Sequence, residues 1–234
     1  MTRADEVVFR PVFGGNAFEE TFARLLQAVR LGITAPGEAL PSERDLASRL
    51  GVSRDVVRDA IAALADAGFV ERRRGRYGGT FVLQDLTGAA PPAPERDAER
   101  VHDVLALRRV LEEGAVAEAA ARTLAAEDRD RLWSRTLETA AAGTADYRRA
   151  DSRLHLALGE LAGVPSLLPL LADARDRVNA LLDEIPLLEA NLAHSNAQHE
   201  AIVQAVLRGD PGAARRAMRE HLDGTAALLH AFLD

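Results

Sequence analysis

The sequence predicts a mostly α-helical fold, in which an N-terminal winged helix-turn-helix is followed by an all-α helical bundle. Three observations support this prediction. Residues 40–82 contain two short helical patterns joined by a tight turn, and a glycine-rich hairpin pattern follows them. Residues 87–94 are rich in proline and alanine and can continue neither a helix nor a central strand. From Ala98 onward, apolar residues recur at helical spacing without any strand pattern.

The same observations predict two domains joined by a linker. We expect a head at residues 1–83, in which residues 1–17 form a flexible arm without clear periodicity. The linker is expected at residues 84–97 and an all-α domain at residues 98–234. A chain of 234 residues is long enough to give each of the two domains its own core.

The composition excludes several classes of site. The chain has no cysteine, which rules out disulfides, thiolate metal sites and cysteine nucleophiles. Its longest uncharged run, residues 161–172, is too short to span a bilayer. The N-terminus lacks the apolar segment of a signal peptide, so we expect a cytoplasmic protein.

The net charge of −7 is distributed unevenly along the chain. Residues 1–90 carry 12 arginines and 12 acidic residues, whereas residues 91–234 carry 17 arginines and 24 acidic residues. The arginines of the front half cluster at residues 44–58 and 72–76. Because DNA binding needs a local basic patch rather than a basic protein, the front half remains a candidate for it.

The head is predicted to begin with a helix over residues 18–31, since apolar side chains recur there at helical spacing. Ser42 is the expected N-cap of a second helix that ends at Gly51, and Ser53 is the expected N-cap of a third. The third helix buries Val57, Ile61 and Leu64 on one side and ends at Gly68. Two short strands, residues 69–72 and 80–82, then enclose a basic hairpin tip.

This arrangement places arginines where a helix-turn-helix contacts DNA. Arg54 and Arg58 lie four residues apart, on the exposed face of the third helix. Arginine can bind guanine edges in the major groove and also phosphates. The basic tip, residues 72–76, would lie along the DNA as a wing. The alternative is a helix pair with solvated arginines, because such pairs also occur in proteins that never bind DNA.

The head resembles the winged helix-turn-helix of the GntR family of bacterial transcription regulators. The matching motifs are Pro36-Gly37, LPSER at residues 40–44, LGVSR at residues 50–54, Val57-Arg58 and GGTFV at residues 78–82. The resemblance implies that the DNA contacts fall on Arg44, Ser53, Arg54, Asp55, Arg58, Arg74 and Gly75. Asp55 departs from the pattern, since an acid repels phosphate unless it accepts a hydrogen bond from a cytosine amino group.

The C-terminal domain is predicted to contain six helical segments. Their expected ranges are 98–125, 127–142, 145–162, 165–184, 189–208 and 211–232. Between the last two, Gly209 is placed to end a helix, Asp210 to cap the next and Pro211 to begin it. We expect an all-α bundle of antiparallel neighbours.

Four residues of this bundle have a spacing that suggests metal binding. Asp151 and His155 are four residues apart on one helix face. His199 lies 10 residues before Gly209 and His221 lies 12 residues after it, so a helical hairpin would bring both imidazoles to the same height. Three imidazoles and a carboxylate suit a divalent transition metal such as zinc, nickel or manganese. The alternative is a surface salt bridge together with ordinary core or surface histidines.

The back half also resembles a family domain, the FCD effector domain of the FadR branch of GntR regulators. The motifs are D-x-x-x-H at residues 151–155 and H-x-x-I-x-x-A at residues 199–205, followed by Gly209-Asp210 and by M-x-x-H at residues 218–221. The resemblance implies that Asp151, His155, His199 and His221 hold a metal ion, zinc before nickel or manganese. It argues against an acyl-CoA effector, because acyl-CoA-binding members lack this set. Leu154 and residues 164–166 depart from the pattern, so the shape of the pocket is not carried over.

Arg108 lies between Val104 and Leu111 on a largely apolar helix face, so it is expected to point inward. A buried arginine needs an anion, and a carboxylate effector that bridges the metal and the guanidinium would supply one. The alternative partner is Glu112 or Glu113 within the same helix.

Taken together, these patterns predict a dimeric, metabolite-responsive transcription regulator, most readily a repressor, and not an enzyme. Two heads would bind the half-sites of a pseudo-palindromic DNA operator, and the bundle would bind a metal and a small carboxylate. Two alternatives stay open: the same head with a metal-free effector pocket, or a metal-dependent hydrolytic enzyme.

Overall fold

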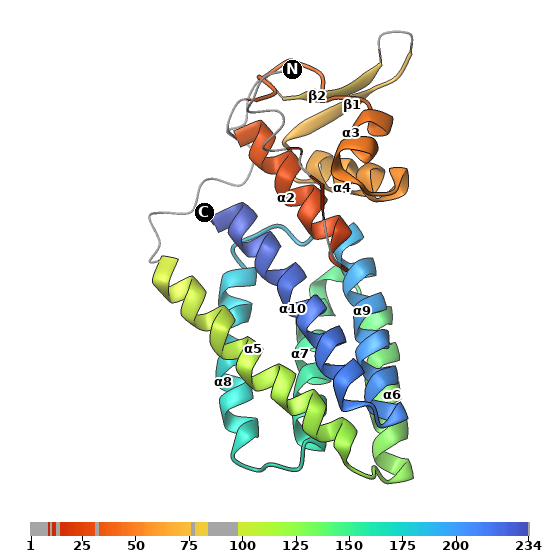
Figure 1. The fold of residues 1–234 in the computed structure, drawn as a ribbon. Coiled ribbons are helices and arrows are strands. Elements are labelled where there is room, and N and C mark those ends of the chain that lie inside the picture. The colour runs from red at the N-terminus through yellow and green to blue at the C-terminus, as the bar shows by residue number, and fades with distance from the viewer. Residues whose placement is uncertain are drawn as a thin grey trace. The chain divides into compact units, whose positions relative to one another are not determined.

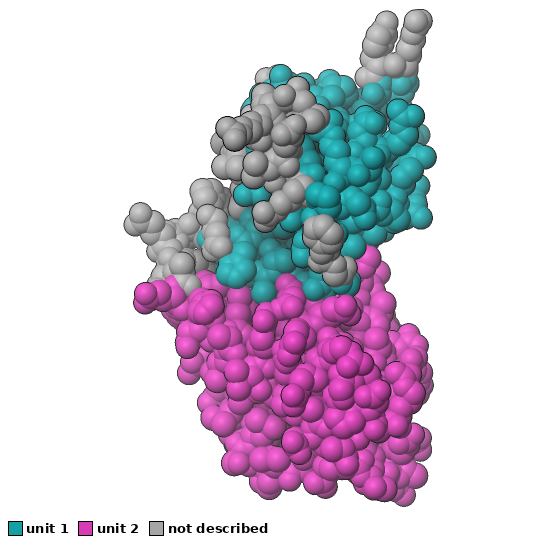
Figure 2. Space-filling model, viewed as in Figure 1, with its two compact units in different colours: residues 1–94, 188–191, 224–234 teal, residues 95–187, 192–223 magenta. Residues whose placement is uncertain are grey.

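The computed structural model describes residues 9, 11–12, 15–30, 33–75, 78–83 and 98–233. These residues form a mostly helical protein with a small two-stranded sheet near the N-terminus (Figure 1), which confirms the predicted fold class. The chain separates into two compact units, coloured in Figure 2. Unit 1 contains residues 1–94, 188–191 and 224–234, and unit 2 contains residues 95–187 and 192–223. The predicted linker at residues 84–97 lies outside the described residues.

The helices of unit 1 begin and end close to where the sequence places them. Helix α2 spans Ala17–Arg30, α3 spans Glu43–Leu50 and α4 spans Arg54–Asp66. The hydroxyl of Ser42 accepts a hydrogen bond from the Asp45 amide, and that of Ser53 accepts one from the Val56 amide, which confirms both N-caps. Gly51 ends α3 in the left-handed conformation with φ 69° and thus sets the turn between the two helices.

Strands β1 (Val70–Arg73) and β2 (Gly79–Val82) pair antiparallel, with Val70 opposite Val82. They begin one residue away from the predicted bounds, since Phe69 precedes β1 and Gly79 joins β2. The Phe69 side chain is buried in the unit 1 core. The hairpin is thereby anchored at its base.

The core of unit 1 is aromatic. Phe18 and Phe22 of α2 are fully buried and their rings stack with centroids 6.4 Å apart. Helix α10 (Pro211–Leu233) brings Phe232, near its C-terminal end, into the same core, 5.4 Å from the Phe22 ring and 6.5 Å from the Phe69 ring. Residues 224–234, expected as part of the C-terminal domain, therefore group with the head.

Part of the expected flexible arm is fixed. The side chains of Phe9 and Val12 are buried, and the Val12 amide donates a hydrogen bond to the Leu50 carbonyl. The Arg49 guanidinium also lies 6.0 Å from the centroid of the Phe9 ring. The prediction of a free arm is wrong at these residues, because periodicity does not detect single apolar side chains that cover a helix end.

Unit 2 is a helical bundle that matches the predicted segments within a few residues. Its helices are α5 (Ala98–Ala121), α6 (Ala126–Ala141), α7 (Thr144–Leu161), α8 (Leu167–Leu182), α9 (Glu189–Arg208) and most of α10. Helix α7 is central, since it packs against α5, α6 and α8. Gly209, with φ 72°, ends α9, and the Asp210 carboxylate accepts a hydrogen bond from the Ala213 amide at the start of α10.

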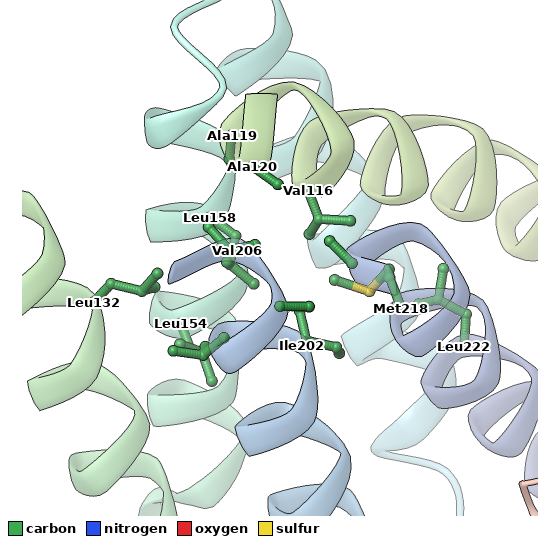
Figure 3. Close-up of a cluster of buried hydrophobic side chains, with 13 residues drawn as sticks. Val116, Ala119, Ala120, Leu132, Leu154, Leu158, Ile202, Val206, Met218 and Leu222 are labelled. Atoms are coloured by element: carbon green, nitrogen blue, oxygen red, sulfur yellow. The ribbon is translucent and has the colours of Figure 1, made fainter. Parts of the chain in front are cut away.

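An apolar core joins α5, α6, α7, α9 and α10 (Figure 3). Leu154, Ile202 and Met218 are almost completely buried in it. Each of them lies within three residues of a predicted metal ligand along its helix. The packing of these side chains therefore fixes the positions of the ligand-bearing helices relative to one another.

Candidate functional site

The sequence-predicted DNA contacts lie on the surface of unit 1, around the start of α4. Ser53, Arg54, Asp55 and Arg58 are all exposed. The Ser53 hydroxyl accepts the helix-capping hydrogen bond, so this residue fixes the first turn of α4. Arg54 is the first residue of that turn, where the side chains of a recognition helix reach base edges.

Asp55 and Arg58 form an ion pair across one turn of α4. The backbone carbonyl of Arg58 accepts a hydrogen bond of 3.1 Å from the Arg72 guanidinium, which also lies 3.4 Å from a Glu43 oxygen. The wing strand is thus tied to both α3 and α4. Asp55 offsets the charge of Arg58 within the free protein, which gives this departure from the family pattern a structural role.

The hairpin carries further arginines in different settings. The Arg73 guanidinium lies 4.5 Å from the centroid of the Phe81 ring and pairs with Glu71, so it is held against the strand. Arg74 is exposed, and Gly75 adopts φ 107°, a conformation that favours glycine. Arg44 is also open to solvent, with 83% of its side chain exposed. Arg76 lies outside the described residues.

The predicted metal ligands come together inside unit 2. Asp151 and His155 on α7, His199 on α9 and His221 on α10 are all buried, and one potential ligand atom from each lies within 4.8 Å of the others. Nε2 of His199 is 3.3 Å from Nε2 of both His155 and His221. Oδ1 of Asp151 is 3.1 Å from Nε2 of His199. The Gly209 hairpin thus aligns the two C-terminal histidines as the sequence predicted.

The orientation of two imidazoles is set by hydrogen bonds on the opposite side of each ring. Nδ1 of His155 donates to a carboxylate oxygen of Glu112. Nδ1 of His221 lies 3.2 Å from Oε1 of Gln198, which is an acceptor. With both Nδ1 atoms engaged in this way, the two rings direct their Nε2 atoms toward the centre of the cluster. This is the orientation that a metal-binding histidine requires.

The spacing of the ligand atoms fits a small divalent cation. In a tetrahedral site with metal–nitrogen bonds of about 2.0–2.1 Å, neighbouring ligand nitrogens lie about 3.3–3.4 Å apart. The two Nε2–Nε2 separations are 3.3 Å, and Oδ1 of Asp151 lies 3.6 Å from Nε2 of His155. The residues present therefore fit a transition metal in both chemistry and spacing.

Electrostatics also favours the ligand-competent forms of these groups. Burial lowers the pKa of His199 and, with its two neighbouring histidines, holds that of His221 well below its ordinary value. Burial raises the pKa of Asp151, but the Arg175 guanidinium and the neighbouring His155 and His199 together outweigh it and keep this pKa well below its usual range. Both histidines are thus kept neutral and the aspartate ionised, as metal binding requires.

Two supporting residues, Arg175 and Gln198, were not predicted from the sequence. Glu112 was named only as a possible partner of Arg108, and its hydrogen bond with His155 was not predicted. Arg175 on α8 is 2% exposed and pairs with Oδ2 of Asp151. Its position between the buried residues Leu171 and Val178 on one helix face was a usable signal. Gln198 carries no such signal, because nothing in its helical spacing indicates that it accepts a hydrogen bond from an imidazole.

Arg108 points inward as predicted and is 2% exposed. Its Nε donates a hydrogen bond of 3.0 Å to Glu112, the intrahelical partner that was the alternative to an effector. Its Nη1 is buried without a hydrogen-bond partner among the described residues. Arg108 therefore has a protein partner and also a donor left for another group.

Comparison with known proteins identifies both halves of the chain. Residues 18–82 match the family model described as bacterial regulatory proteins, gntR family, and residues 103–224 match the FCD domain. The chain belongs to the GntR family. It is 33% identical over 239 residues to the HTH-type transcriptional repressor NanR of Enterobacter sp. (strain 638), covering 95% of this chain and 89% of that protein. It is 30% identical to NanR of Cronobacter sakazakii over 230 residues, with coverage of 93% and 87%.

Among solved structures, E. coli McbR/YncC shares the fold with a TM-score of 0.52 at 19% identity, and the match covers 92% of this chain and 97% of that chain. This GntR protein is therefore a DNA-binding transcriptional regulator with an FCD effector domain, and not an enzyme. None of its described helices is long and apolar enough to cross a membrane.

The Asp55–Arg58 pair predicts an effect on DNA affinity. Replacing Asp55 by Asn removes one negative charge from the surface of the GntR head that is predicted to face DNA, and it releases Arg58. We expect the variant to bind a random-sequence duplex a few-fold more tightly and with a steeper dependence on salt, measured by fluorescence anisotropy. The variant could instead bind more weakly, and only to a duplex selected by the wild-type protein. That result would show that Asp55 accepts a hydrogen bond from a base.

The lowered pKa values of His199 and His221 predict a loss of stability in acid. In the unfolded chain these imidazoles take up protons as the pH falls below about 6.5, while the buried imidazoles resist protonation. The free energy of unfolding of chelator-treated protein should therefore decrease between pH 7.5 and pH 5.5, measured by urea denaturation. His221→Gln should flatten this dependence, whereas His102→Gln at an exposed position should leave it unchanged.

Proposed function

We propose that this GntR regulator is a dimeric repressor whose FCD domain binds a divalent metal and a small carboxylate that modulates operator binding. The observation that carries the proposal is the convergence of Asp151, His155, His199 and His221 inside that domain. The relatives named as repressors support the direction of regulation. A DNA-binding regulator of this bacterial family would act in the cytoplasm.

The metal would be held by one oxygen of Asp151 and by Nε2 of each of the three histidines. Zinc suits three imidazoles and one carboxylate best, and nickel or manganese are the other candidates. A bound divalent ion supplies positive charge and coordination positions that carboxylate oxygens of an effector can occupy. Glu112 and Gln198 would hold two of the imidazoles, and Arg175 would hold the aspartate.

On the DNA side, Arg54 and Arg58 would contact base edges, and Arg44 and Arg74 would contact phosphates. Two heads of a dimer would bind the two halves of a pseudo-palindrome. This assignment is supported by the exposure of all four arginines and by the capped start of α4.

Helix α10 is the element through which effector binding would affect the head. It carries His221 of the cluster and, three turns later, Phe232 of the unit 1 core. An effector that changes the position of α10 in the bundle would change how that core is packed. The coupling free energy between the two sites would follow from this shared helix.

A metal-free version of the same regulator is the competing possibility, because the four residues already contact one another and Arg175 as a polar network. Elemental analysis of protein purified without a histidine tag decides between the two. We expect about one transition-metal ion per chain. His199→Ala and Asp151→Ala should lose it, whereas His102→Ala at an exposed position should retain it. Wild-type protein that stays metal-free after resupply and dialysis would support the polar network.

The assignment of α4 predicts which arginines matter for DNA binding. Arg54→Ala and Arg58→Ala should each weaken binding to a duplex selected by the wild-type protein, by about 1–3 kcal/mol. Arg131→Ala, an exposed arginine on α6 of unit 2, is the matched control and should have no effect. Full-strength binding by the Arg54/Arg58 double variant would refute this interface.

A further inference from the structure

The charges around the cluster balance only as long as no metal is bound. Arg108, Arg175 and Glu112 are each 2% exposed and Asp151 is 8% exposed, so two buried cations face two buried carboxylates. The three imidazoles are neutral when they act as ligands. A divalent ion in the cluster therefore leaves an excess of two positive charges in the interior.

The neighbouring charged residues do not remove this excess. Glu113 forms a two-point ion pair with Arg219, at 2.7 and 3.0 Å. Asp183 pairs with Arg148 at 2.9 Å. Each of these pairs is neutral by itself, so the two additional positive charges need an anion from outside the chain. Unbalanced buried charge is strongly unfavourable in a protein interior.

The two buried guanidiniums also have donors to spare. Nη1 of Arg108 and both Nε and Nη1 of Arg175 are buried without a hydrogen-bond partner among the described residues. Both side chains approach Oε1 of Glu112, Arg108 through Nε at 3.0 Å and Arg175 through Nη1 at 3.7 Å, which is too far for a hydrogen bond. Two guanidiniums thus lie beside a single carboxylate oxygen, and both keep buried donors that no described residue accepts.

We propose that the effector of this site is a dianion, such as a small dicarboxylate, and that Arg175 is the residue that selects its second negative charge. The inference rests on the proposed function, because the excess charge arises only when the metal is bound. A planar guanidinium suits this role, since it can present two parallel donors to a carboxylate. The guanidinium pair would bind one carboxylate, and the positive charge of a metal held by Asp151 and the three histidines would attract the other.

Arg175 would hold Asp151 and bind the effector at the same time, because different nitrogens of its guanidinium serve each purpose. Its Nη2 pairs with Oδ2 of Asp151 and so orients Oδ1 toward the imidazoles. Its Nε and Nη1 remain for the effector. Arg108 uses only Nε for Glu112 and adds Nη1 to the same group of donors.

A surface pocket next to Arg175 offers a route for such an anion. The pocket has a volume of about 500 Å³, and its lining includes Ser152 and Asn179. Ser152 accepts hydrogen bonds from Nη2 of Arg175 at 3.4 Å and from Asn179 at 2.9 Å. A single layer of polar side chains therefore separates the pocket from the buried arginine.

The test compares dianions with monoamides of the same size. Metal-loaded, full-length protein is titrated by calorimetry with oxalate against oxamate, and with malonate against malonamate. We expect each dianion to bind at least about tenfold more tightly than its monoamide. In Arg175→Gln, and also in Arg108→Gln, this ratio should fall to about threefold or less. Arg177→Gln, an exposed arginine two residues further along α8, should keep it.

Metal content and DNA affinity are measured on the same samples, so failure of the proposed function is distinguishable. If chelator-treated wild-type protein no longer binds dianions more tightly than monoamides, the bound metal is the reason why the effector needs two negative charges. Equal affinity of dianion and monoamide for metal-loaded wild-type protein would overturn the proposal, as would the absence of any binding. A preference that persists in a metal-containing Arg175→Gln variant would overturn the role of Arg175. If Arg175→Gln loses its metal, the wild-type and Arg108→Gln comparisons still decide the charge requirement.

Discussion

The buried carboxylate of Asp151 is the group on which the arrangement of the bundle depends. One of its oxygens faces the imidazoles and the other pairs with Arg175, so it connects α7 to α8 and α9 at a single point. Glu112 makes the corresponding connection between α5 and α7 through His155, and it pairs with Arg108 within α5. Removing one partner of such a buried pair costs about 3–5 kcal/mol, because the other charge is left uncompensated. The polar centre therefore ties the helices together at one point, while the apolar core beside it fixes their positions and supplies most of the favourable burial.

The site is built from residues far apart in the chain, yet much of it could be predicted. Helical spacing and the Gly209 stop signal were enough to place His199 and His221 at one height, and the Asp151–His155 spacing gave one shared face. What the pattern could not give is the set of charges that surround these ligands. Arg175 comes from α8, and its partner depends on how α8 packs against α7, which is a tertiary property.

The head shows a similar division. Caps, turns and the hairpin follow local rules, and their positions were predicted within about one residue. The burial of Phe9 and Val12 and the insertion of Phe232 into the same core depend on long-range packing instead. When a single apolar residue lies in an aperiodic segment or at the end of a long helix, the neighbouring sequence does not indicate which core it will pack into. The C-terminal residues of α10 consequently group with a domain that begins some two hundred residues earlier in the chain.

Arginine has opposite uses in the two halves. On the head, exposed guanidiniums such as Arg44 are solvated and interact weakly with their own acidic neighbours, 3.9 Å away for Asp45, so they remain available to phosphate. In the bundle, Arg108 and Arg175 are removed from water, where their charge stays fixed because guanidinium does not lose its proton. A buried lysine can lose its proton and become neutral, but a buried arginine cannot. It can only be balanced by anions, and the two carboxylates of the chain serve until a metal adds charge. Recognition of the proposed anionic effector would then follow from the same electrostatic constraint that holds the helices together.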